Sequence, residues 1–226
     1  MAQQARKIDD PRTERTRNAL LTSAIRLFGS KGFQNTTMRD LAQESGANIA
    51  AINYHFGSKD NLRVETARTF AAIMNTRGPG EKLKQLSPDQ ISRMSADTAK
   101  STLRDIMIAN IRHMTTDEQG SHIQRFFLRE VFSDDFDISI LFELAFSSHF
   151  QLMAQLVSRV TDLPADSDAC KIKTLIMMGQ SIFLCMAQPL IETAMNWSDY
   201  GEQQLALMLD AFWLDPTPKS QSVSEQ

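Results

Sequence analysis

The sequence of 226 residues predicts an all-α protein, with a small N-terminal helix-turn-helix domain followed by a larger helical domain. Apolar residues recur at helical spacing through most of the chain. No segment combines the alternation of a β-strand with hairpin turns, and two short capped helices joined by a glycine turn lie near the N-terminus. These three observations favour helices packed on helices throughout.

The first predicted helix begins near Pro11 and carries apolar residues at helical spacing from Leu20 to Phe28. Gly32 suits the position after its end, because glycine adopts a left-handed backbone without a Cβ clash. Residues 1–12 are expected to form a flexible basic arm.

The segment 36–56 predicts two short helices joined by a tight turn. Thr37 can accept a bond from the free N–H groups of the first turn, and Asp40 can complete a capping box. Gly46 can end the first helix, and Asn48 can cap the second. This is the sequence form of a helix-turn-helix, although an ordinary αα-hairpin is the alternative for this segment alone.

The rest of the chain predicts further helices separated by polar or proline-containing breaks. The expected helices cover residues 59–77, a short stretch from residue 88, then 95–114, 121–132, 136–160, 167–194 and 200–212. The predicted organisation is therefore an arm (1–12), a helix-turn-helix domain (13–72, motif 37–56), an effector-binding and dimerisation domain (73–215) and a disordered tail (216–226).

Charge is unevenly distributed along the chain, whose net charge is −3. Residues 1–68 hold 11 Lys or Arg against 7 Asp or Glu, whereas residues 69–226 hold 13 against 20. A basic first part is suited to binding the phosphates of DNA, and the acidic second part is expected to form a separate domain that does not bind DNA.

Composition argues against several other classes of protein. Cys170 and Cys185 on one helix would lie about 22 Å apart, too far for a disulfide, so buried thiols are expected, with redox sensing as the alternative. We expect no metal and no cofactor, and no catalytic constellation indicates an enzyme. No long uncharged apolar run and no signal-peptide core are present, so a soluble cytoplasmic protein without a membrane partner is expected.

An ordered series of residues resembles the DNA-binding domain of TetR/AcrR-type transcriptional repressors. The series is Leu20, Leu21, Ala24, Leu27, Phe28, Gly32, Phe33, Thr36, Thr37, Leu41, Ala42, Gly46, Ile52, Tyr54, His55, Phe56, Lys59 and Leu62. The resemblance covers residues 13–70, and residues 125–197 are similar to the CecR-type subclass of this family.

The resemblance implies that the helix after Asn48 enters the major groove of DNA. The residues that it places against bases are Arg39, Ile49, Ala50, Ala51 and Asn53. Arg39 suits guanine and Asn53 suits adenine. Because Ile49 and Asn53 depart from the common family pattern, the operator sequence cannot be taken from a relative. Backbone contacts are expected from Thr37, Tyr54, His55, Ser58 and Lys59, and flanking contacts from Arg6, Lys7, Arg12, Arg15 and Arg17. Asn48 is a further DNA-binding candidate.

The segment 173–190 is apolar around its whole girth, which predicts burial on two sides. One side can pack on its own domain and the other on a partner, with a central core helix in a monomer as the alternative. The resemblance implies a homodimer formed through the last two long helices.

Methionine and phenylalanine are frequent in the second part, which is consistent with an adaptable apolar pocket for a small-molecule effector. Simple core packing is the alternative for each of these residues. The candidate walls are Met107, Ile111, Phe127, Phe146, Phe150, Met153, Met178 and Phe183, and the candidate polar anchors are His113, Arg125, Arg129, Gln180 and Gln188.

Together these features predict a DNA-binding transcriptional regulator. The resemblance implies a repressor that binds a palindromic operator as a homodimer and is released by a small apolar or amphipathic effector. The alternative is a helical carrier of a lipophilic small molecule, with a head that does not bind DNA.

Overall fold

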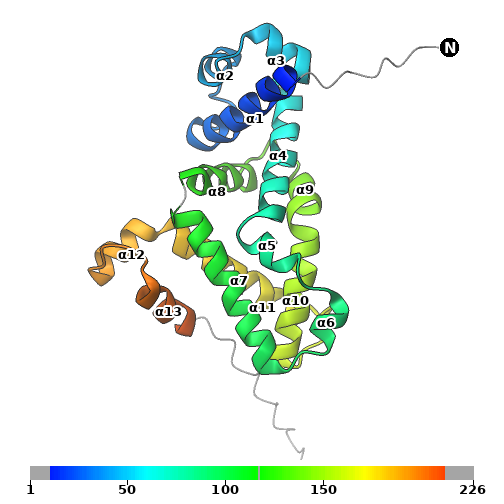
Figure 1. Ribbon diagram of the computed structural model, residues 1–226, viewed down its shortest axis with the longest axis vertical. Helices are drawn as coiled ribbons and strands as arrows, with labels where there is room; N and C mark the ends of the chain where they lie inside the picture. The colour runs from blue at the N-terminus through cyan, green and yellow to red at the C-terminus, as the bar shows by residue number, and fades with distance from the viewer. Residues whose placement is uncertain (1–10, 117, 212–226) are drawn as a thin grey trace, which may run out of the picture. The chain divides into compact units, whose positions relative to one another are not determined.

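The computed structural model describes residues 11–116 and 118–211, and it is helical with no strand in these ranges (Figure 1). The predicted all-α fold class is confirmed. The elements are α1 (Pro11–Lys31), α2 (Met38–Ser45), α3 (Ile49–Phe56), α4 (Lys59–Thr76), α5 (Pro79–Leu83), α6 (Pro88–Ser92), α7 (Ala96–Thr116), α8 (Glu118–Val131), α9 (Ile138–Leu141), a π-helical turn (Phe142–Phe146), α10 (Ser147–Thr161), α11 (Asp168–Met186), α12 (Gln188–Met195) and α13 (Glu202–Ala211).

The helices form two compact units. In the part of the chain that is described, the first unit holds residues 11–73 and 118–145, and the second holds residues 74–116 and 146–211. The first break falls next to the predicted boundary at residue 72. Residues 118–145, which the sequence assigned to the second domain, group with the first unit instead.

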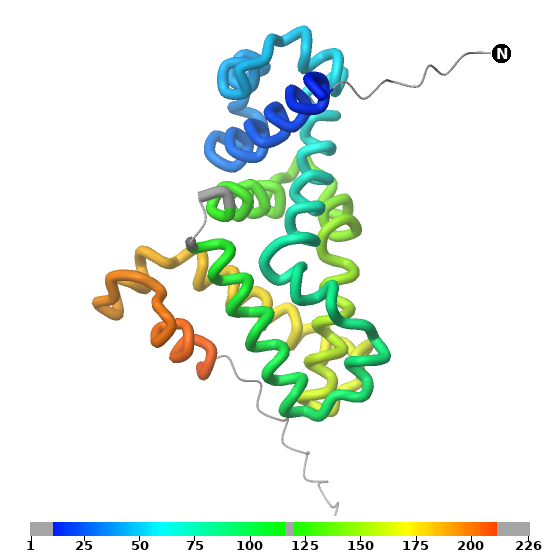
Figure 2. The backbone as a smooth tube through the Cα atoms, in the orientation of Figure 1, coloured from blue at the N-terminus to red at the C-terminus, as the bar shows by residue number. Residues whose placement is uncertain are grey.

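Within the first unit, α8 packs across α1 (Figure 2, green beside blue). A Cβ atom on Gly29 would lie 3.0 Å from both the His122 carbonyl oxygen and the Phe126 backbone nitrogen, so glycine permits this close approach. Phe126 is fully buried, and its ring centroid lies 5.8 Å from that of Phe70 on α4. Residues far apart in the sequence therefore share one core.

The second unit packs α7 against α10 and α11, with the short α5 and α6 alongside. Its core is almost entirely apolar, and most of its members come from the three longer helices. The fully or nearly fully buried members include Leu103, Ile106, Met107, Ile111, Met153, Leu156, Val157, Cys170 and Met177.

Two predicted long helices differ in detail from the structure. The first spans residues 138–161 with a π-helical turn inside it, rather than the regular helix expected over 136–160. The second, expected over 167–194, is interrupted at Ala187. Pro189 explains this break, because it has no N–H to donate to a preceding turn and its ring obstructs a continuous helix.

Two ionisable groups in the second unit are protected from deprotonation. Burial raises the pKa of the Cys185 thiol from 9.0 to about 12. Burial, with smaller effects of Cys185 and Glu192, raises the pKa of Tyr200 from 10.0 to about 12. The Tyr200 hydroxyl donates to the Leu184 carbonyl oxygen at 2.9 Å, which ties the segment after α12 to α11.

These shifts predict a loss of stability at alkaline pH. The folded chain keeps both protons where the unfolded chain releases them, so the free energy of unfolding should fall as the pH rises from about 9 toward 12. Tyr200→Phe should flatten this fall and, at neutral pH, cost about 1 kcal/mol for the lost hydrogen bond. Urea unfolding across this pH range measures both effects. Tyr54→Phe, on a ring that is 63% exposed, is the control, and an equal flattening in that variant would contradict the prediction.

Candidate nucleic-acid interface

Helix α2 begins at the capping box that the sequence predicted. The Thr37 hydroxyl accepts from the Asp40 backbone N–H at 3.1 Å, and the Asp40 carboxylate accepts from the Thr37 backbone N–H at 2.8 Å. Lys31 donates to the same carboxylate at 2.8 Å. The Lys31 bond and then the Thr37 bonds hold the pKa of Asp40 far below its usual range, so the cap remains charged.

The turn and α3 also follow from local sequence chemistry. Gly46 has φ 68° and ψ 11°, the left-handed conformation that favours glycine at a helix end. The Asn48 side chain accepts from the Ala51 backbone N–H at 2.7 Å and begins α3. Ile52 and Phe56 are buried and hold α3 on the core of the first unit. The opposite face of α3 is therefore turned to solvent.

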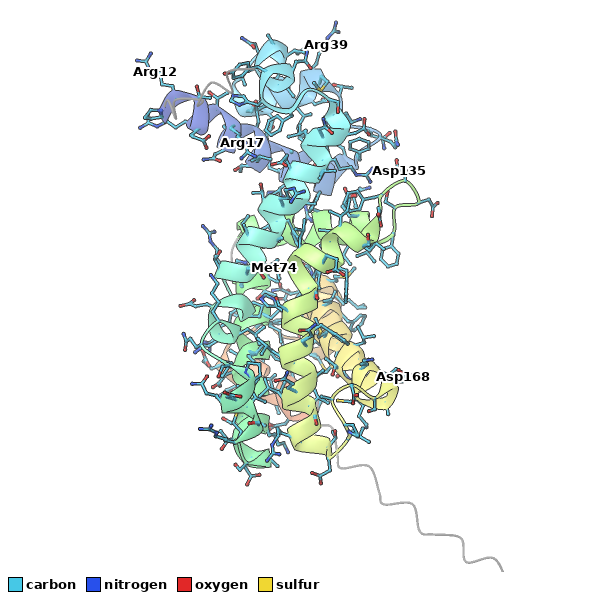
Figure 3. The ribbon with its side chains drawn as sticks, turned by 90° about the vertical axis from the view of Figure 1, so that its right-hand side faces the viewer. Arg12, Arg17, Arg39, Met74, Asp135 and Asp168 are labelled. Atoms are coloured by element: carbon cyan, nitrogen blue, oxygen red, sulfur yellow. The ribbon has the colours of Figure 1, made fainter. Side chains whose placement is uncertain are left out.

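The outer surface of α2 and α3 carries the predicted base-reading residues. Arg39 projects from α2 into solvent (Figure 3). On α3, Ile49, Ala50 and Asn53 are exposed, and Ala51 is half-buried. All five residues therefore belong to two consecutive helices, and four of them are exposed.

The predicted backbone-contacting residues include exposed and partly buried side chains. Tyr54 is exposed and its ring meets that of His55 edge to face, with centroids 5.2 Å apart. The Lys59 ammonium lies 4.2 Å from the centroid of the Phe33 ring, and burial lowers the pKa of Lys59. The Thr37 hydroxyl donates to Asp40 at 2.6 Å, so it could donate to a phosphate only by giving up that bond.

The predicted arm is only partly within the described residues. Arg6 and Lys7 lie outside them, whereas Arg12, Arg15 and Arg17 belong to α1. Arg17 donates to Glu65 on α4 at 2.6 Å and lies 5.6 Å from the centroid of the Phe56 ring. Arg17 follows the predicted arm of residues 1–12, and its side chain joins α1 to α4.

A buried ion pair that sequence reasoning missed joins α4 to the end of α8. The Arg63 side chain is 5% exposed and the Glu130 side chain 2%, and their nearest N and O atoms are 2.7 Å apart. Arg63 also donates to Asp135 at 3.0 Å, and its guanidinium lies 4.1 Å from the centroid of the Phe33 ring. Bonds from Ser133, Gln34 and Arg63 hold the pKa of Asp135 at about 2. In the sequence, Arg63 stands between the apolar residues Leu62 and Val64, which indicates a buried arginine. This pattern does not identify Glu130 as the partner of Arg63.

Arg129, predicted as a polar anchor of an effector pocket, instead contacts the end of α1. It donates to the Gly29 carbonyl oxygen and to the Ser30 carbonyl oxygen, each at 2.8 Å. These are carbonyls of the last helical turn, which lack partners within the helix. Arg129 thus helps to place α1 and, through it, the helix-turn-helix.

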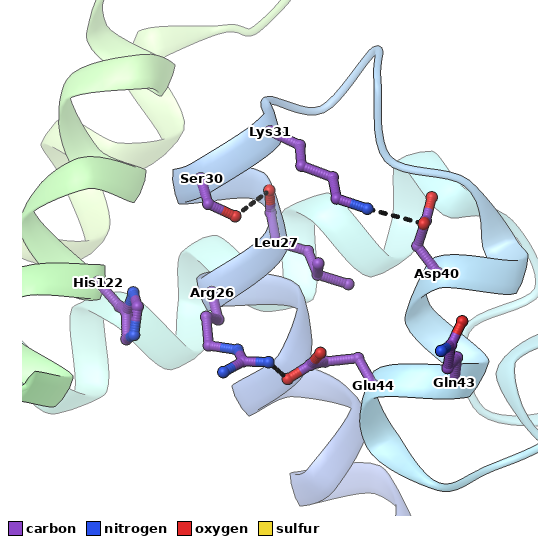
Figure 4. Close-up of a pocket in the computed structure, with 8 residues that line it drawn as sticks. All are labelled: Arg26, Leu27, Ser30, Lys31, Asp40, Gln43, Glu44 and His122. Atoms are coloured by element: carbon purple, nitrogen blue, oxygen red, sulfur yellow. Dashed lines mark hydrogen bonds and ion pairs between the residues drawn. The ribbon is translucent and has the colours of Figure 1, made fainter.

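A polar hollow of about 370 Å³ is formed by α1, α2 and α8 of the first unit (Figure 4). Two ion pairs cross it, Lys31 to Asp40 and Arg26 to Glu44, and both join α1 to α2. His122 of α8 lies on the opposite wall. Because each cation in the hollow already faces an anion, the hollow is better explained as a brace for α2 than as a ligand site.

The predicted effector residues are divided between the two units. Arg125, Phe127 and Arg129 lie in the first unit, and the Phe127 ring stacks on that of Phe70 with centroids 5.8 Å apart. In the second unit, Met107, Ile111 and Met153 are buried in the core and Met178 packs against it. The remaining candidates of that unit are His113, Phe146, Phe150, Gln180, Phe183 and Gln188.

An open apolar hollow of about 730 Å³ lies among α11, α12 and α13. Two of the predicted effector-binding residues, Gln180 and Phe183, line this hollow. Its other lining residues are Gly179, Leu184, Ile191, Met195, Trp197, Leu207, Met208 and Ala211. Sequence reasoning missed these last residues because the break at Ala187, which folds α12 and α13 toward α11, was not predicted.

Other site types find little support in the described ranges. Cys170 and Cys185 are free, buried thiols, and burial raises the pKa of both. Among the residues described, no cluster of three or more His, Cys, Asp or Glu side chains could hold a metal ion. The stretches Ile138–Thr161 and Asp168–Met186 are long and apolar enough to cross a membrane, a property that core helices of soluble proteins share.

The capped helix-turn-helix, with its solvent-exposed outer face and its separate helical second unit, defines the class of DNA-binding transcription regulators. The family model for bacterial regulatory proteins of the tetR family matches residues 20–66. The model for the C-terminal domain of the HTH-type transcriptional dual regulator CecR matches residues 99–212, about half of the chain. The chain belongs to the TetR family of bacterial regulatory proteins, whose members are not enzymes.

Individual relatives agree with this assignment. The dual regulator CecR of Shigella flexneri is 24% identical over 200 residues, which cover 86% of each chain. The regulator BetI of Agrobacterium fabrum is 38% identical over 79 residues, 31% of this chain and 38% of BetI. Regulators of this family bind DNA operators and small-molecule effectors and act as dimers.

Solved structures share the fold at low sequence identity. The hemolysin II transcriptional regulator HlyIIR gives a TM-score of 0.59 at 16% identity, covering 88% of this chain and 97% of its own. AibR, solved in complex with isovaleryl coenzyme A and operator DNA, gives 0.58 at 14% identity, covering 87% and 95%.

The buried ion pair predicts a large effect of a small substitution. Glu130→Gln keeps the shape of the side chain but leaves the Arg63 guanidinium with less compensation, so it should lower the free energy of unfolding by about 3 kcal/mol. Thermal and urea unfolding measure this loss. Glu143→Gln, on an exposed side chain, is the matched control. A loss no larger than that of the control would show that the pair does not hold the first unit together.

Proposed function

We propose that this protein is a cytoplasmic transcriptional repressor that binds a palindromic operator as a homodimer. The observation that carries the proposal is the solvent-facing surface of α2 and α3, with Arg39 and Asn53 on its outer side. One such surface covers only a few base pairs, and a twofold dimer presents two of them to two half-sites. The family's dimeric, DNA-binding character supports this arrangement.

In this proposal, Arg39 and Asn53 are the main residues that recognise the base sequence of the DNA. The guanidinium of Arg39 can donate to two acceptors of a guanine, and the amide of Asn53 can both donate to and accept from an adenine. Ala50 and Ala51 have no polar atoms beyond the backbone, so they permit close approach and methyl contact only. With few polar readers, the shape and deformability of the DNA contribute to specificity.

Release from DNA is assigned to an apolar or amphipathic effector bound by the second unit. The hollow of α11, α12 and α13 is lined almost entirely by apolar side chains, with Gln180 as a polar anchor. AibR, which shares the fold, was solved in complex with isovaleryl coenzyme A and operator DNA, which supports a small-molecule ligand for the proposed regulator. Such a ligand acts by favouring a dimer conformation in which the two helix-turn-helix domains do not fit successive half-sites.

Arg39→Ala should weaken binding to the preferred site by about 1–3 kcal/mol and relax the preference at one base pair, because a bidentate base contact is lost. The preferred site is obtained by selection from a random DNA library. Fluorescence anisotropy on that duplex and on a scrambled duplex, over a salt series, then measures specific and non-specific binding. Equal weakening on both duplexes would show that Arg39 contacts only the phosphate backbone.

Lys171→Ala is the matched control, because it removes an exposed positive charge from the second unit. It should leave both affinities unchanged. Failure to select any sequence, together with binding that does not weaken as salt rises, would favour the carrier alternative over the repressor.

A further inference from the structure

The hollow of α11, α12 and α13 is apolar, and much of its lining is open to solvent. Phe183, Met195 and Leu207, one from each of the three helices, line it and are 58%, 53% and 61% exposed. Among its lining side chains, polar atoms come from Gln180 and from the indole of Trp197. Its volume of about 730 Å³ lies in the range of sites that enclose a small molecule. Apolar surface gathered in this way and left in water marks an interaction site.

Helix α13, which forms one wall of the hollow, is fixed to α7 near both of its ends. Near its last turn, Asp210 accepts from Arg104 of α7 at 2.7 Å. At its first residue, Glu202 pairs with Arg112 of the same helix. Leu209 is fully buried in the core of the second unit. The position at which the chain leaves α13 is therefore determined by contacts with the core of that unit.

The chain leaves α13 at the hollow itself. Ala211, the last residue of α13, is exposed and is one of the residues that line the hollow. The next three residues in the sequence are Phe212, Trp213 and Leu214, which lie outside the described residues. Residues 215–226 contain a single valine among polar residues and prolines. The large apolar side chains that follow α13 are thus concentrated in the three positions next to the hollow.

We propose that Phe212, Trp213 and Leu214 fold back into the hollow of their own chain and form a plug. Three extended residues reach about 10 Å, so Leu214 is the plug residue that lies farthest from α13, toward Met195 of α12. Each aromatic side chain can bury about 150–250 Å². The plug therefore removes its own apolar surface and that of the hollow from water together. Asp215 and the proline after it return the chain to solvent.

Attachment at Ala211 favours the plug over other occupants of the hollow. A segment tethered beside its site has an effective concentration in the millimolar range. A free ligand or a second chain must instead reach the hollow from dilute solution and lose translational and rotational freedom. A second copy of this chain is the competing occupant, and its binding differs from the plug in depending on protein concentration.

The plug would regulate the ligand site of the proposed function, and this consequence rests on that function. An apolar effector must displace the same three side chains to reach the hollow. Its apparent dissociation constant is therefore raised by the inverse of the fraction of molecules whose hollow is open. Ligands that offer less apolar surface than the plug do not displace it, so the plug selects for effectors with a large apolar part.

Fluorescence of Trp213 tests the plug in the full chain. Trp197→Phe leaves Trp213 as the sole tryptophan. Emission of the folded protein should lie at shorter wavelength than in urea, and acrylamide should quench it several-fold less. Both results should hold from tens of nanomolar to tens of micromolar, because a contact within one chain does not depend on concentration. Emission and quenching equal to those in urea would overturn the proposal, and protection that is lost on dilution would assign the cover to a second copy.

Disulfide trapping locates the plug. The pair Leu214→Cys and Met195→Cys should form an intrachain disulfide, because the plug brings the two Cα atoms within about 7 Å. The pair Leu214→Cys and Lys171→Cys should not, because Lys171 precedes Gly179, the first lining residue of α11, by about 12 Å along the helix. The wild type, with its two buried thiols, is the oxidation control. An interchain disulfide, or none, would contradict a plug within one chain.

Binding of the amphipathic dye anilinonaphthalene sulfonate tests competition for the hollow. Phe212→Ser, Trp213→Ser and Leu214→Ser together should lower the dissociation constant of the dye at least about tenfold, because the plug no longer competes. In that background, Leu207→Gln should reverse the gain, since Leu207 lines the hollow. Leu190→Gln is the matched control, on a residue that is 65% exposed and is not a lining residue of the hollow. Dye binding unchanged by the three serines would show that the hollow is not plugged.

Selection of DNA by the same chains separates this inference from the proposed function. A chain that selects an operator but leaves Trp213 open to acrylamide keeps the repressor and loses the plug. A chain that protects Trp213 and forms the intrachain disulfide, yet selects no DNA sequence, keeps the plug and loses the repressor. The two sets of measurements therefore fail independently.

Discussion

The buried guanidinium of Arg63 is the interaction on which the first unit depends. It pairs with Glu130 and Asp135 and lies against the Phe33 ring. A buried charge of this kind is tolerated only while its partners are in place, because desolvation of an unpaired ion costs several kcal/mol. Arg63 therefore fixes the segment after α8 on α4, and Arg129 fixes α8 on the end of α1. The helix-turn-helix is thus supported by residues that follow it by more than sixty positions.

Sequence reasoning was most successful where the determinants are local. The capping box of α2, the left-handed Gly46 and the Asn48 cap each involve residues within three positions of one another, and the structure contains all three. The Arg63 network joins residues 67 and 72 positions apart, and no periodicity in a single sequence pairs them. Residues 118–145 pack with the first unit although residues of the second unit precede them in the chain, because contacts and not chain order decide where α8 packs.

The predicted pocket residues, which were chosen by their apolar type, differ in how deeply the structure buries them. Met107, Ile111 and Met153 belong to the packed core, whereas Phe183 is 58% exposed beside the hollow of α11, α12 and α13. An apolar residue type indicates that a position avoids water, but it does not say whether the chain itself, a ligand or another chain covers it. For 173–190 the sequence predicted burial on two sides, and the structure shows which side the chain leaves uncovered.

Helix α11 joins the proposed activities of the second unit. Phe183 is 58% exposed and also lines the hollow, and the Leu184 carbonyl accepts the bond from Tyr200. In the proposed homodimer a ligand in the hollow would contact one of the long helices through which the resemblance implies that the two chains associate. Such a ligand can shift the dimer only by as much as its affinity differs between two dimer states. In the proposed regulator, a side chain of α11 such as Phe183 would supply that difference if its rotamer changed on ligand binding, because it lines the hollow and is also 58% exposed.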